Sequence, residues 1–347
     1  MRNMLITGGA GFIGSNFIPY YLEKEEGISI INLDNLTYAG NINNLKELVN
    51  YERYKFIKGD ICDKELVYSI FSDYDIKGVI HLAAESHVDN SIKDSDIFMR
   101  TNVLGTHNLV KVAYNQWMDS PFTIKKECAD CRFLHVSTDE VYGSLGKDGL
   151  FSEKTPYDPR SPYSASKAGS DMIVKAFHHT YGLNVVLTNC GNNYGPKQHD
   201  EKLIPTIIRN ALLQRKIPIY GDGKNIRDWV YVEDHCRGLE LVFNMGKSGE
   251  NYNIGGKNER DNNYIAKKVC EILDELVPKN NGSYKDQITY VKDRPGHDKR
   301  YAIDASKIKS ELGWKAKMNF EGGIKETVKW YLNNKTWVAE GRDCYSD

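Results

Sequence analysis

The run Met4-Leu5-Ile6-Thr7-Gly8-Gly9-Ala10-Gly11-Phe12-Ile13-Gly14 stands near the start of a chain of 347 residues. Residues 4–7 predict a buried strand, and the glycines after them predict a tight turn that opens a helix. Glycines at this spacing let the backbone approach a pyrophosphate at the helix N-terminus, where amide groups are unpaired. A glycine-rich surface turn would use the same residues, but the strand-turn-helix context favours a dinucleotide site.

The first half of the chain alternates short apolar runs with amphipathic stretches. The runs that predict buried strands are residues 4–7, 29–33, 55–58, 79–82, 133–136 and 185–188. Amphipathic stretches between them, including residues 96–117 and 163–181, predict helices. Strands that alternate with helices form a parallel sheet covered on both faces. We therefore predict an α/β fold with a Rossmann-type doubly wound parallel sheet.

The second half of the chain is less regular. The predicted helices are residues 203–214, 233–245, 262–277 and 320–333, and the predicted short strands are residues 217–220, 230–232 and 289–291. No repeat or low-complexity linker interrupts the chain, so we expect two packed lobes with a cleft between them. We predict a dinucleotide-binding domain over residues 1–190. Residues 191–347 are predicted to form a smaller mixed α/β substrate lobe, with segments that return to the first domain.

Composition excludes several classes of partner. The net charge is -1, so nothing indicates binding to nucleic acid or to a membrane surface. No apolar run is long enough to span a bilayer, and the first residues resemble neither a signal peptide nor a transit peptide. An odd, scattered set of cysteines argues against a disulfide framework and for a reducing cytoplasm. These cysteines are Cys62, Cys128, Cys131, Cys190, Cys236, Cys270 and Cys344.

Cys128-Ala129-Asp130-Cys131 is a lone CxxC motif. A zinc site needs about four ligands, and the chain has no second cysteine pair. We therefore predict a thiol pair in a surface loop and no metal site.

Carboxylates and small residues follow the next predicted strands. Asp34 ends the second strand, about 20 residues after the glycine turn, where it would accept hydrogen bonds from ribose hydroxyls. Because a carboxylate there repels a 2′-phosphate, NAD is favoured over NADP. Asp60 and Ile61 after the third strand would meet adenine, although an aspartate there could simply cap the next helix. The small residues in Leu82-Ala83-Ala84-Glu85-Ser86 would leave room for the dinucleotide.

The chemistry is concentrated in Ser137-Thr138-Asp139-Glu140-Val141-Tyr142-Gly143 and Tyr163-Ser164-Ala165-Ser166-Lys167. Tyr163 and Lys167 are four residues apart, so they fall on one face of a helix. An ammonium beside a phenol favours the phenolate and lowers a pKa that is ordinarily about 10. Such a base suits hydride chemistry at a sugar alcohol. The adjacent carboxyl groups of Asp139 and Glu140 indicate further proton transfers, for which a simple alcohol dehydrogenase has no need.

These motifs together resemble the extended short-chain dehydrogenase/reductase superfamily and, within it, the dTDP-glucose 4,6-dehydratase family. The similar blocks are residues 8–15, 33–41 (LDNLTYAGN), 81–89 (HLAAESHVD), 136–143 (VSTDEVYG), 161–168 (SPYSASKA), 192–196 (NNYGP), 220–235 (YGDGKNIRDWVYVEDH), 253–256 and 293–304 (DRPGHDKRYAID). The pair Asp139-Glu140 is the specific signal, because the other blocks mainly define the superfamily. Asn90 and Gly191 depart from the family pattern, and Lys197 and Asp200 lie in a variable loop.

The resemblance implies a redox-neutral cycle that yields a 4-keto-6-deoxy sugar. Tyr163 as phenolate takes the C4 hydroxyl proton while hydride passes to NAD, and Lys167 holds the phenolate and the nicotinamide ribose. Glu140 removes the C5 proton, which is acidic once C4 is a ketone. Protonated Asp139 donates to the departing C6 hydroxyl, and Thr138 hydrogen-bonds the C4 oxygen. Two adjacent carboxyl groups in a dry cleft repel, so one of them can stay protonated near neutrality.

The resemblance also implies two sets of binding residues. The cofactor set is Gly8, Gly11, Phe12, Ile13, Gly14, Asp34, Asn35, Leu36, Thr37, Asp60, Ile61, Leu82, Ala83, Ala84, Ser86, Thr101, Tyr163, Lys167 and Asn193. The substrate set is Ser86, Thr138, Asn192, Lys202, Leu203, Pro218, Ile219, Tyr220, Arg227, Asn262, Asp293, Arg294, Pro295, Gly296 and His297. A diphosphate needs cations, for which Lys202, Arg227 and Arg294 are the candidates.

The expected substrate is therefore dTDP-glucose, and the family implies a homodimer in which residues 96–117 and 163–181 form a four-helix bundle with a second copy. One alternative is another nucleotide-sugar enzyme of the superfamily, such as an epimerase or a decarboxylase. Neither reaction needs an acid for a C6 hydroxyl, so Asp139 discriminates. A second alternative is a non-catalytic NAD-binding sensor or scaffold, which need not keep Tyr163, Lys167, Asp139 and Glu140 together. Nothing in these residues distinguishes a thymine base from a uracil base.

Overall fold

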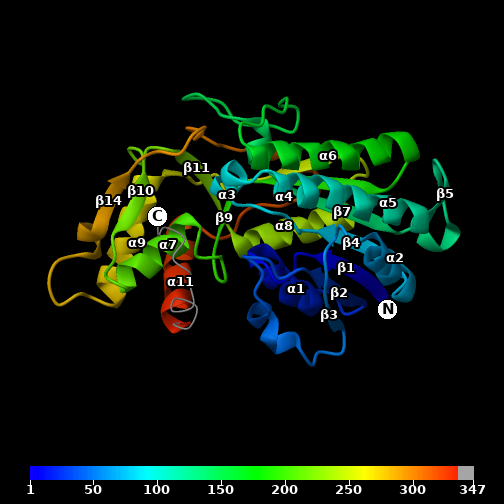
Figure 1. Ribbon diagram of the computed structural model, residues 1–347, viewed down its shortest axis with the longest axis horizontal. Helices are drawn as coiled ribbons and strands as arrows, with labels where there is room; N and C mark the ends of the chain where they lie inside the picture. The colour runs from blue at the N-terminus through cyan, green and yellow to red at the C-terminus, as the bar shows by residue number, and fades with distance from the viewer. Residues whose placement is uncertain (335–347) are drawn as a thin grey trace.

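A seven-stranded parallel sheet forms the centre of the larger lobe (Figure 1). The computed structural model describes residues 1–334. The sheet has the order β12-β8-β7-β4-β1-β2-β3, and every neighbouring pair is parallel. Its strands are β1 (Arg2–Thr7), β2 (Ile28–Asp34), β3 (Tyr54–Lys58), β4 (Ile76–His81), β7 (Arg132–Thr138), β8 (Val185–Cys190) and β12 (Asn251–Ile254). The predicted Rossmann-type sheet is confirmed.

Helices cover both faces of this sheet and enclose two apolar cores. Along β1 the side chains alternate, so Met4 and Ile6 enter one core and Leu5 enters the other. Helices α1 (Phe12–Lys24), α8 (Val232–Met245) and α10 (Ser306–Leu312) cover the first face. Helices α2 (Lys64–Asp73), α5 (Thr106–Trp117) and α6 (Pro162–Tyr181) cover the second. The sheet, these helices and the two cores are called the first lobe below.

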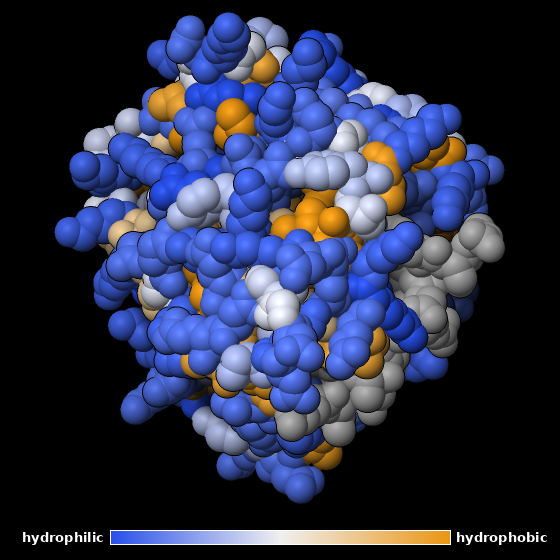
Figure 2. Space-filling model, turned by 90° about the vertical axis from the view of Figure 1, so that its left-hand side faces the viewer, coloured by the Kyte–Doolittle hydropathy of each residue, from blue (hydrophilic) through white to orange (hydrophobic). Residues whose placement is uncertain are grey.

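The second lobe, on the left of Figure 1, encloses a third core between small sheets and three helices. Strands β9 (Asn192–Tyr194), β11 (Ile226–Tyr231) and β13 (Glu259–Asp261) form one sheet, and β10 (Ile217–Tyr220) and β14 (Ile288–Val291) form another. The helices are α7 (Leu203–Leu212), α9 (Asn262–Leu276) and α11 (Phe320–Asn333). The outer face of this lobe is mostly hydrophilic, with a few hydrophobic side chains near its centre (Figure 2).

The remaining elements connect these layers. They are α3 (Val88–Lys93), α4 (Asp96–Phe98), a π-helix (Met99–Gly105), β5 (Met118–Ser120), β6 (Thr123–Ile124) and short 3-10 segments at Ile42–Leu48, Lys126–Cys128, Asp139–Tyr142 and Tyr284–Gln287. No helix within residues 1–334 is long and apolar enough to cross a membrane.

The structure corrects several predictions. The sheet has a seventh strand, β12, that we did not predict, because its four residues include two asparagines. The strand predicted at residues 230–232 begins at Ile226, and Val232 already belongs to α8. The helix predicted over residues 96–117 contains the π-helix.

The thiols of Cys128 and Cys131 are buried rather than exposed in a surface loop. Cys344 lies outside the described residues. The domain boundary near residue 190 stays a prediction, and both α8 and β12, which follow it in the chain, pack in the first lobe.

Candidate active site

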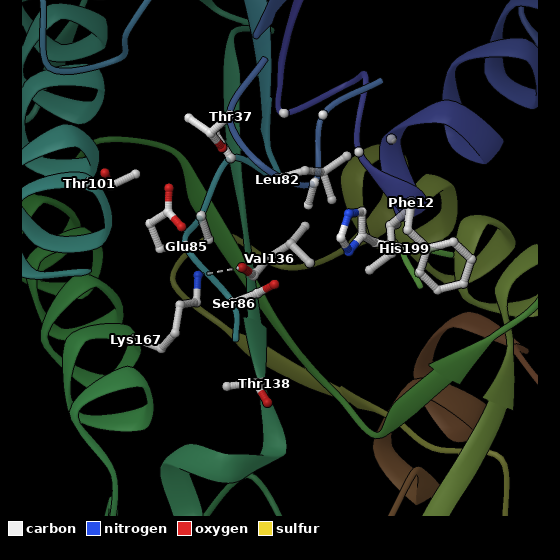
Figure 3. Close-up of a pocket in the computed structure, with 18 of the residues that line it drawn as sticks. Phe12, Thr37, Leu82, Glu85, Ser86, Thr101, Val136, Thr138, Lys167 and His199 are labelled. Atoms are coloured by element: carbon white, nitrogen blue, oxygen red, sulfur yellow. Dashed lines mark hydrogen bonds between the residues drawn. The ribbon is translucent and has the colours of Figure 1, made fainter. Parts of the chain in front are cut away.

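A cavity of about 320 Å³ lies at the carboxyl ends of the large sheet. The order of the strands reverses between β1 and β4, because the chain first extends the sheet through β2 and β3 and then returns to the other side of β1. In open α/β sheets such a reversal leaves a crevice that binds ligands. The glycine turn, the ends of β2, β4 and β7, and helix α6 all contribute to its lining (Figure 3).

The glycine turn is packed too closely for side chains. A Cβ atom on Gly8 would lie 2.6 Å from the amide nitrogen of Ala83, and Gly8 has a φ of +73°. A Cβ atom on Gly14 would lie 2.5 Å from the carbonyl oxygen of Gly8. Gly11 is the N-cap of α1, and no side chain of the described residues caps that helix. The first amide groups of α1 are therefore left for an anion, which fits the pyrophosphate of a dinucleotide.

Asp34 is fixed at the edge of the same cavity. Its carboxyl oxygens accept hydrogen bonds from the amides of Ala10 and Leu36, each at 2.8 Å. Burial raises the pKa of Asp34, and these two hydrogen bonds oppose the rise. The side chain thus joins the glycine turn to the end of β2, where a ribose would lie.

Helix α6 begins at a capping box. The Ser161 hydroxyl accepts from the amide of Ser164, and the Ser164 hydroxyl accepts from the amide of Ser161, both at 3.0 Å. Pro162 occupies the first turn, where its missing N–H costs nothing. The cap fixes the backbone that carries Tyr163, and Lys167 follows one turn later on the same face.

Tyr163 and Lys167 are both buried beside the end of β7. The Nζ atom of Lys167 donates to the carbonyl oxygen of Val136 at 2.9 Å (Figure 3). Burial raises the pKa of Tyr163 well above its ordinary value, the charge of Glu140 raises it further, and a hydrogen bond with Thr138 lowers it. The expectation that Lys167 lowers this pKa is wrong for the structure as it stands, because the ammonium bonds a backbone carbonyl and burial dominates.

The two adjacent carboxyl groups follow β7 on a 3-10 turn and differ in their surroundings. Burial raises the pKa of Asp139 well above its ordinary range, and the charges of Glu140 and Asp228 raise it further. Burial also raises the pKa of Glu140, but Arg294, Arg227 and Lys202 lower it, in that order. Asp139 is therefore the group held neutral, while cations from the second lobe favour the charged form of Glu140.

The side chains of Lys202, Arg227 and Arg294 differ in their hydrogen-bond partners. Lys202 lines the cavity and donates from Nζ to the carbonyl oxygen of Ser86 at 3.1 Å. Arg227 is buried over the ring of Tyr301, and its Nη2 donates to the carbonyl oxygen of Asp298 at 2.9 Å. The Nε atom of Arg294 is buried and has no hydrogen-bond partner among residues 1–334. An unpartnered buried guanidinium nitrogen is a donor available to an anionic ligand.

Most of the predicted residues meet in the cavity. Those that line it are Gly8, Gly11, Phe12, Ile13, Gly14, Asp34, Asn35, Thr37, Asp60, Ile61, Leu82, Ala83, Ala84, Ser86, Thr101, Thr138, Asp139, Glu140, Tyr163, Lys167, Asn192, Asn193 and Lys202. Those that do not line it are Leu36, Leu203, Pro218, Ile219, Tyr220, Arg227, Asn262, Asp293, Arg294, Pro295, Gly296 and His297. Of these, Tyr220 and Arg294 are linked through Asp89, at 3.1 Å and 3.8 Å from its carboxyl oxygens.

Known proteins similar to this chain were found by sequence and by structure. A family model described as GDP-mannose 4,6 dehydratase matches residues 5–327. The dTDP-glucose 4,6-dehydratase of Xanthomonas campestris pv. campestris (strain B100) is 52% identical over 97% of this chain and 95% of its own length. The dTDP-glucose 4,6-dehydratase of Escherichia coli is also 52% identical, over 96% and 94% of the two chains. The chain belongs to the dTDP-glucose 4,6-dehydratase family.

Solved structures agree with this membership. A dTDP-glucose 4,6-dehydratase from Bacillus anthracis str. Ames in complex with NAD is 46% identical, with a TM-score of 0.84 over 97% of this chain and 98% of that one. A UDP-glucose 4-epimerase from Thermotoga maritima is 29% identical, with a TM-score of 0.83 over 96% and 100% of the two chains. The fold is thus shared with epimerases, whereas the higher identity lies with the dehydratases. The resemblance stated from the motifs is confirmed.

Some cavity residues were missed by the sequence reasoning. They include Glu85, Cys190, Gln198, His199 and Glu201. Cys190 is the last residue of β8 and Glu85 follows β4, so the rule that ligands bind at strand ends could have found them. The other three lie in a loop whose residues have no helical or strand periodicity.

Residues 196–202, which we call the strap, contact both lobes along the cavity. The Nζ atom of Lys197 donates to the carbonyl oxygens of Ser15 and Asn44, at 3.2 Å and 2.9 Å, in the first lobe. At the other end, Asp200 forms a buried ion pair with Arg209 of α7. These contacts at both ends of the strap keep Gln198, His199, Glu201 and Lys202 in the lining of the cavity.

Proposed function

We propose that the protein catalyses the NAD-dependent dehydration of dTDP-glucose to dTDP-4-keto-6-deoxyglucose. The observation that carries this proposal is the pair Asp139-Glu140 in the cavity that also holds Tyr163 and Lys167. Family membership supports it, as does the close fit of the glycine turn to a dinucleotide pyrophosphate.

The reaction needs an oxidation because the C5 proton of glucose is barely acidic. NAD, held by the glycine turn and Asp34, would supply the hydride acceptor for C4 and the hydride donor for C6. Tyr163 accepts the C4 hydroxyl proton, and the hydrogen bond from Thr138 favours its phenolate. Lys167, whose ammonium bonds the carbonyl oxygen of Val136 in the same wall, would hold the nicotinamide ribose. With a ketone at C4, the C5 proton can be removed by a carboxylate.

The two carboxyl groups divide the elimination between them. Glu140, whose charged form is favoured by Arg294, Arg227 and Lys202, takes the C5 proton. Asp139, held neutral by burial, donates its proton to the C6 oxygen, which leaves as water. Glu140 then returns a proton to C5 as the sugar is reduced at C6. General acid and base steps of this kind each contribute roughly 10²–10⁴-fold in rate.

The diphosphate is proposed to bind between the lobes. The donors best placed for it are Lys202 and the Nε of Arg294, which has no partner in the described part of the chain. Tyr220 and Asp89 fix the position of Arg294. The predicted residues of β10 and residues 293–297 complete this end of the site in the proposal.

A homodimer and a cytoplasmic location are also proposed. Exposed apolar side chains occur on α3, the π-helix and α6, and α6 contacts both of the others; they are Ile92, Met99, Leu104 and Met172. Burying them against a second copy would remove them from water. Light scattering of the purified protein checks the dimer. The free thiols found among residues 1–334 are compatible with a reducing compartment.

The direct test incubates the purified protein with dTDP-glucose and, separately, with UDP-glucose. We expect the dTDP sugar to lose one molecule of water, as measured by mass spectrometry. A product of unchanged mass but altered sugar configuration would support the epimerase alternative. Comparison of the two rates determines the preference for the base.

NAD is expected to copurify with the protein, and turnover is expected to need no added cofactor. The reason is that the cycle is redox-neutral, so each oxidation is reversed before product leaves. The measurement is the absorbance of reduced nicotinamide during turnover, together with the NAD content of the purified protein. One reduced cofactor per sugar converted would contradict the proposed cycle.

Lys197→Met is expected to weaken NAD retention. Two charge-assisted hydrogen bonds join the strap to the first lobe, and losing them should raise the Kd for NAD by about tenfold or more. NAD content after dialysis, and kcat at saturating NAD, are the measurements. Lys224→Met, at an exposed position in the second lobe, is the matched control. Unchanged NAD retention in Lys197→Met would show that the strap plays no part in holding the cofactor.

A further inference from the structure

Helix α6 carries a third buried polar residue on the face of Tyr163 and Lys167. Asp171 lies eight residues after Tyr163 and is fully buried. Its Oδ2 atom accepts hydrogen bonds from the hydroxyls of Ser137 and Tyr157, at 2.9 Å and 2.8 Å. It does not line the cavity, and the mechanism above assigns it no step.

Asp171 belongs to a set of bonds that hold the last residues of β7. Lys167 bonds the carbonyl oxygen of Val136, and Asp171 accepts from the hydroxyl of Ser137. Asn189 of β8 donates to the carbonyl oxygen of Thr138 at 2.9 Å and lies 3.4 Å from Oδ2 of Asp171. Three consecutive residues, 136–138, are thus fixed from α6 and β8. The next two residues in the chain are the proposed acid and base.

We propose that Asp171 is a positioning residue that fixes the end of β7 against α6, so that Asp139 and Glu140 stay in register with Tyr163 and Lys167. Its carboxylate also provides a buried negative charge one turn from Lys167, which helps to keep the ammonium charged. This role rests on the proposed function for its catalytic meaning, although the geometry and the charge of Lys167 can be tested without turnover.

The electrostatics of the neighbourhood agree with this placement. Burial opposes ionisation of Asp171, but His135, Lys167 and Ser137 outweigh it and hold its pKa below the ordinary value. The Nε2 atom of His135 lies 3.1 Å from Oδ1, and burial lowers the pKa of His135 to about 4, so this ring is neutral at neutral pH. Burial lowers the pKa of Lys167, while Asp171 and then Cys190 oppose that fall.

Other charged or titratable groups also face this pair. Lys175 lies one turn further along α6, with its Nζ 3.5 Å from the hydroxyl of Tyr157, and the charge of Asp171 raises its pKa against the effect of burial. His81 of β4 faces Lys167, and burial lowers its pKa well below the ordinary value, so this ring too is uncharged. Burial raises the pKa values of Tyr163 and of the thiol of Cys190, so both groups are neutral. Among the described residues, Asp171 is therefore the carboxylate whose charge acts most strongly on Lys167.

The test compares Asp171→Asn, which keeps the shape and removes the charge, with Ser137→Ala, which keeps the charge and removes one bond. NMR titration of the NAD-bound protein labelled with ¹³C-lysine follows Lys167, whose signal is assigned by its absence in Lys167→Met. We expect the pKa of Lys167 to fall by about one unit or more in Asp171→Asn and to stay unchanged in Ser137→Ala. Lys175→Met is the control, with no fall expected.

The kinetic arm measures kcat against pH with dTDP-glucose. In Asp171→Asn the alkaline limb should move to lower pH, because Lys167 loses its proton earlier. In Ser137→Ala kcat should fall about tenfold or more, while the alkaline limb of its pH profile should stay at the wild-type pH. Full kcat in Ser137→Ala would overturn the positioning role, and an unmoved Lys167 signal in Asp171→Asn would overturn the charge role. Failure of the wild-type protein to release water would refute the proposed function, while the NMR titration would still decide the charge role.

If Asp171→Asn does not fold, Tyr157→Phe and Ser137→Ala together test the same bonds with the carboxylate present. Loss of both hydroxyl donors to Oδ2 should lower kcat by more than either change alone. A double variant with wild-type kcat would overturn the proposal.

Discussion

Tyr163→Phe is expected to lower the rate of the first oxidation, and with it the whole reaction, by roughly 10²–10⁴-fold. Tyr163 is the proposed acceptor for the C4 hydroxyl proton, and phenylalanine keeps the ring but has no oxygen. Because the ring is buried and packs against Phe98, with 6.4 Å between centroids, the apolar replacement should preserve the fold. The measurement is reduction of the bound cofactor after mixing with dTDP-glucose.

The matched control is Tyr68→Phe on the exposed face of α2, which should react as wild type. Reduction of the cofactor at the wild-type rate in Tyr163→Phe would mean that another base acts at C4. The carboxylate of Glu140 would then be the next candidate, because its charge already acts on Tyr163.

Asp139→Asn is expected to leave the first oxidation intact and to slow the loss of water by roughly 10²–10⁴-fold. The amide has nearly the shape of the carboxyl group but cannot give a proton to the departing hydroxyl. Reduced cofactor and a 4-keto sugar that still carries its C6 hydroxyl should accumulate. Rapid mixing with mass analysis of quenched samples detects both.

Glu140→Gln separates the base from the acid. In heavy water this variant should fail to exchange the C5 proton with solvent, whereas Asp139→Asn should still exchange it. If Asp139→Asn eliminates water as fast as wild type, the dehydratase proposal loses its most specific support, and an epimerase-like or decarboxylase-like role becomes the better one.

The strands of the large sheet that are rich in apolar residues could be predicted from the sequence. A strand with polar residues could not, because those residues form hydrogen bonds to partners far away in the sequence. Strand β12 has asparagines at residues 251 and 253, which single-sequence patterns assign to loops. In the fold the amide of Asn253 donates to the Glu153 carboxyl group at 2.9 Å, and its side chain donates to the carbonyl oxygen of Phe151 at 3.0 Å. Such partners lie about a hundred residues away, so no local pattern reveals them.

The candidate site divides in the same way. The residue types and spacing of Asp139, Glu140, Tyr163 and Lys167 were evident in the sequence, and the structure brings all four to one cavity. The direction of the Tyr163 pKa was not predictable, because it depends on burial and on where the Lys167 ammonium points. The contact of the strap with the first lobe was not predictable, since Lys197 bonds Ser15 and Asn44, more than 150 positions away.

The π-helix Met99–Gly105 has one side toward the cavity and one toward solvent. Thr101 lines the cavity, while Met99 and Leu104 are exposed on the surface proposed for the second copy. In the proposed dimer, the π-helix would therefore contact both the second copy and the bound cofactor. Linkage then requires that each binding event strengthen the other if both stabilise the same geometry of that segment. Dilution of the protein would loosen its hold on NAD, and excess NAD would keep the dimer together at concentrations where the apoprotein falls apart.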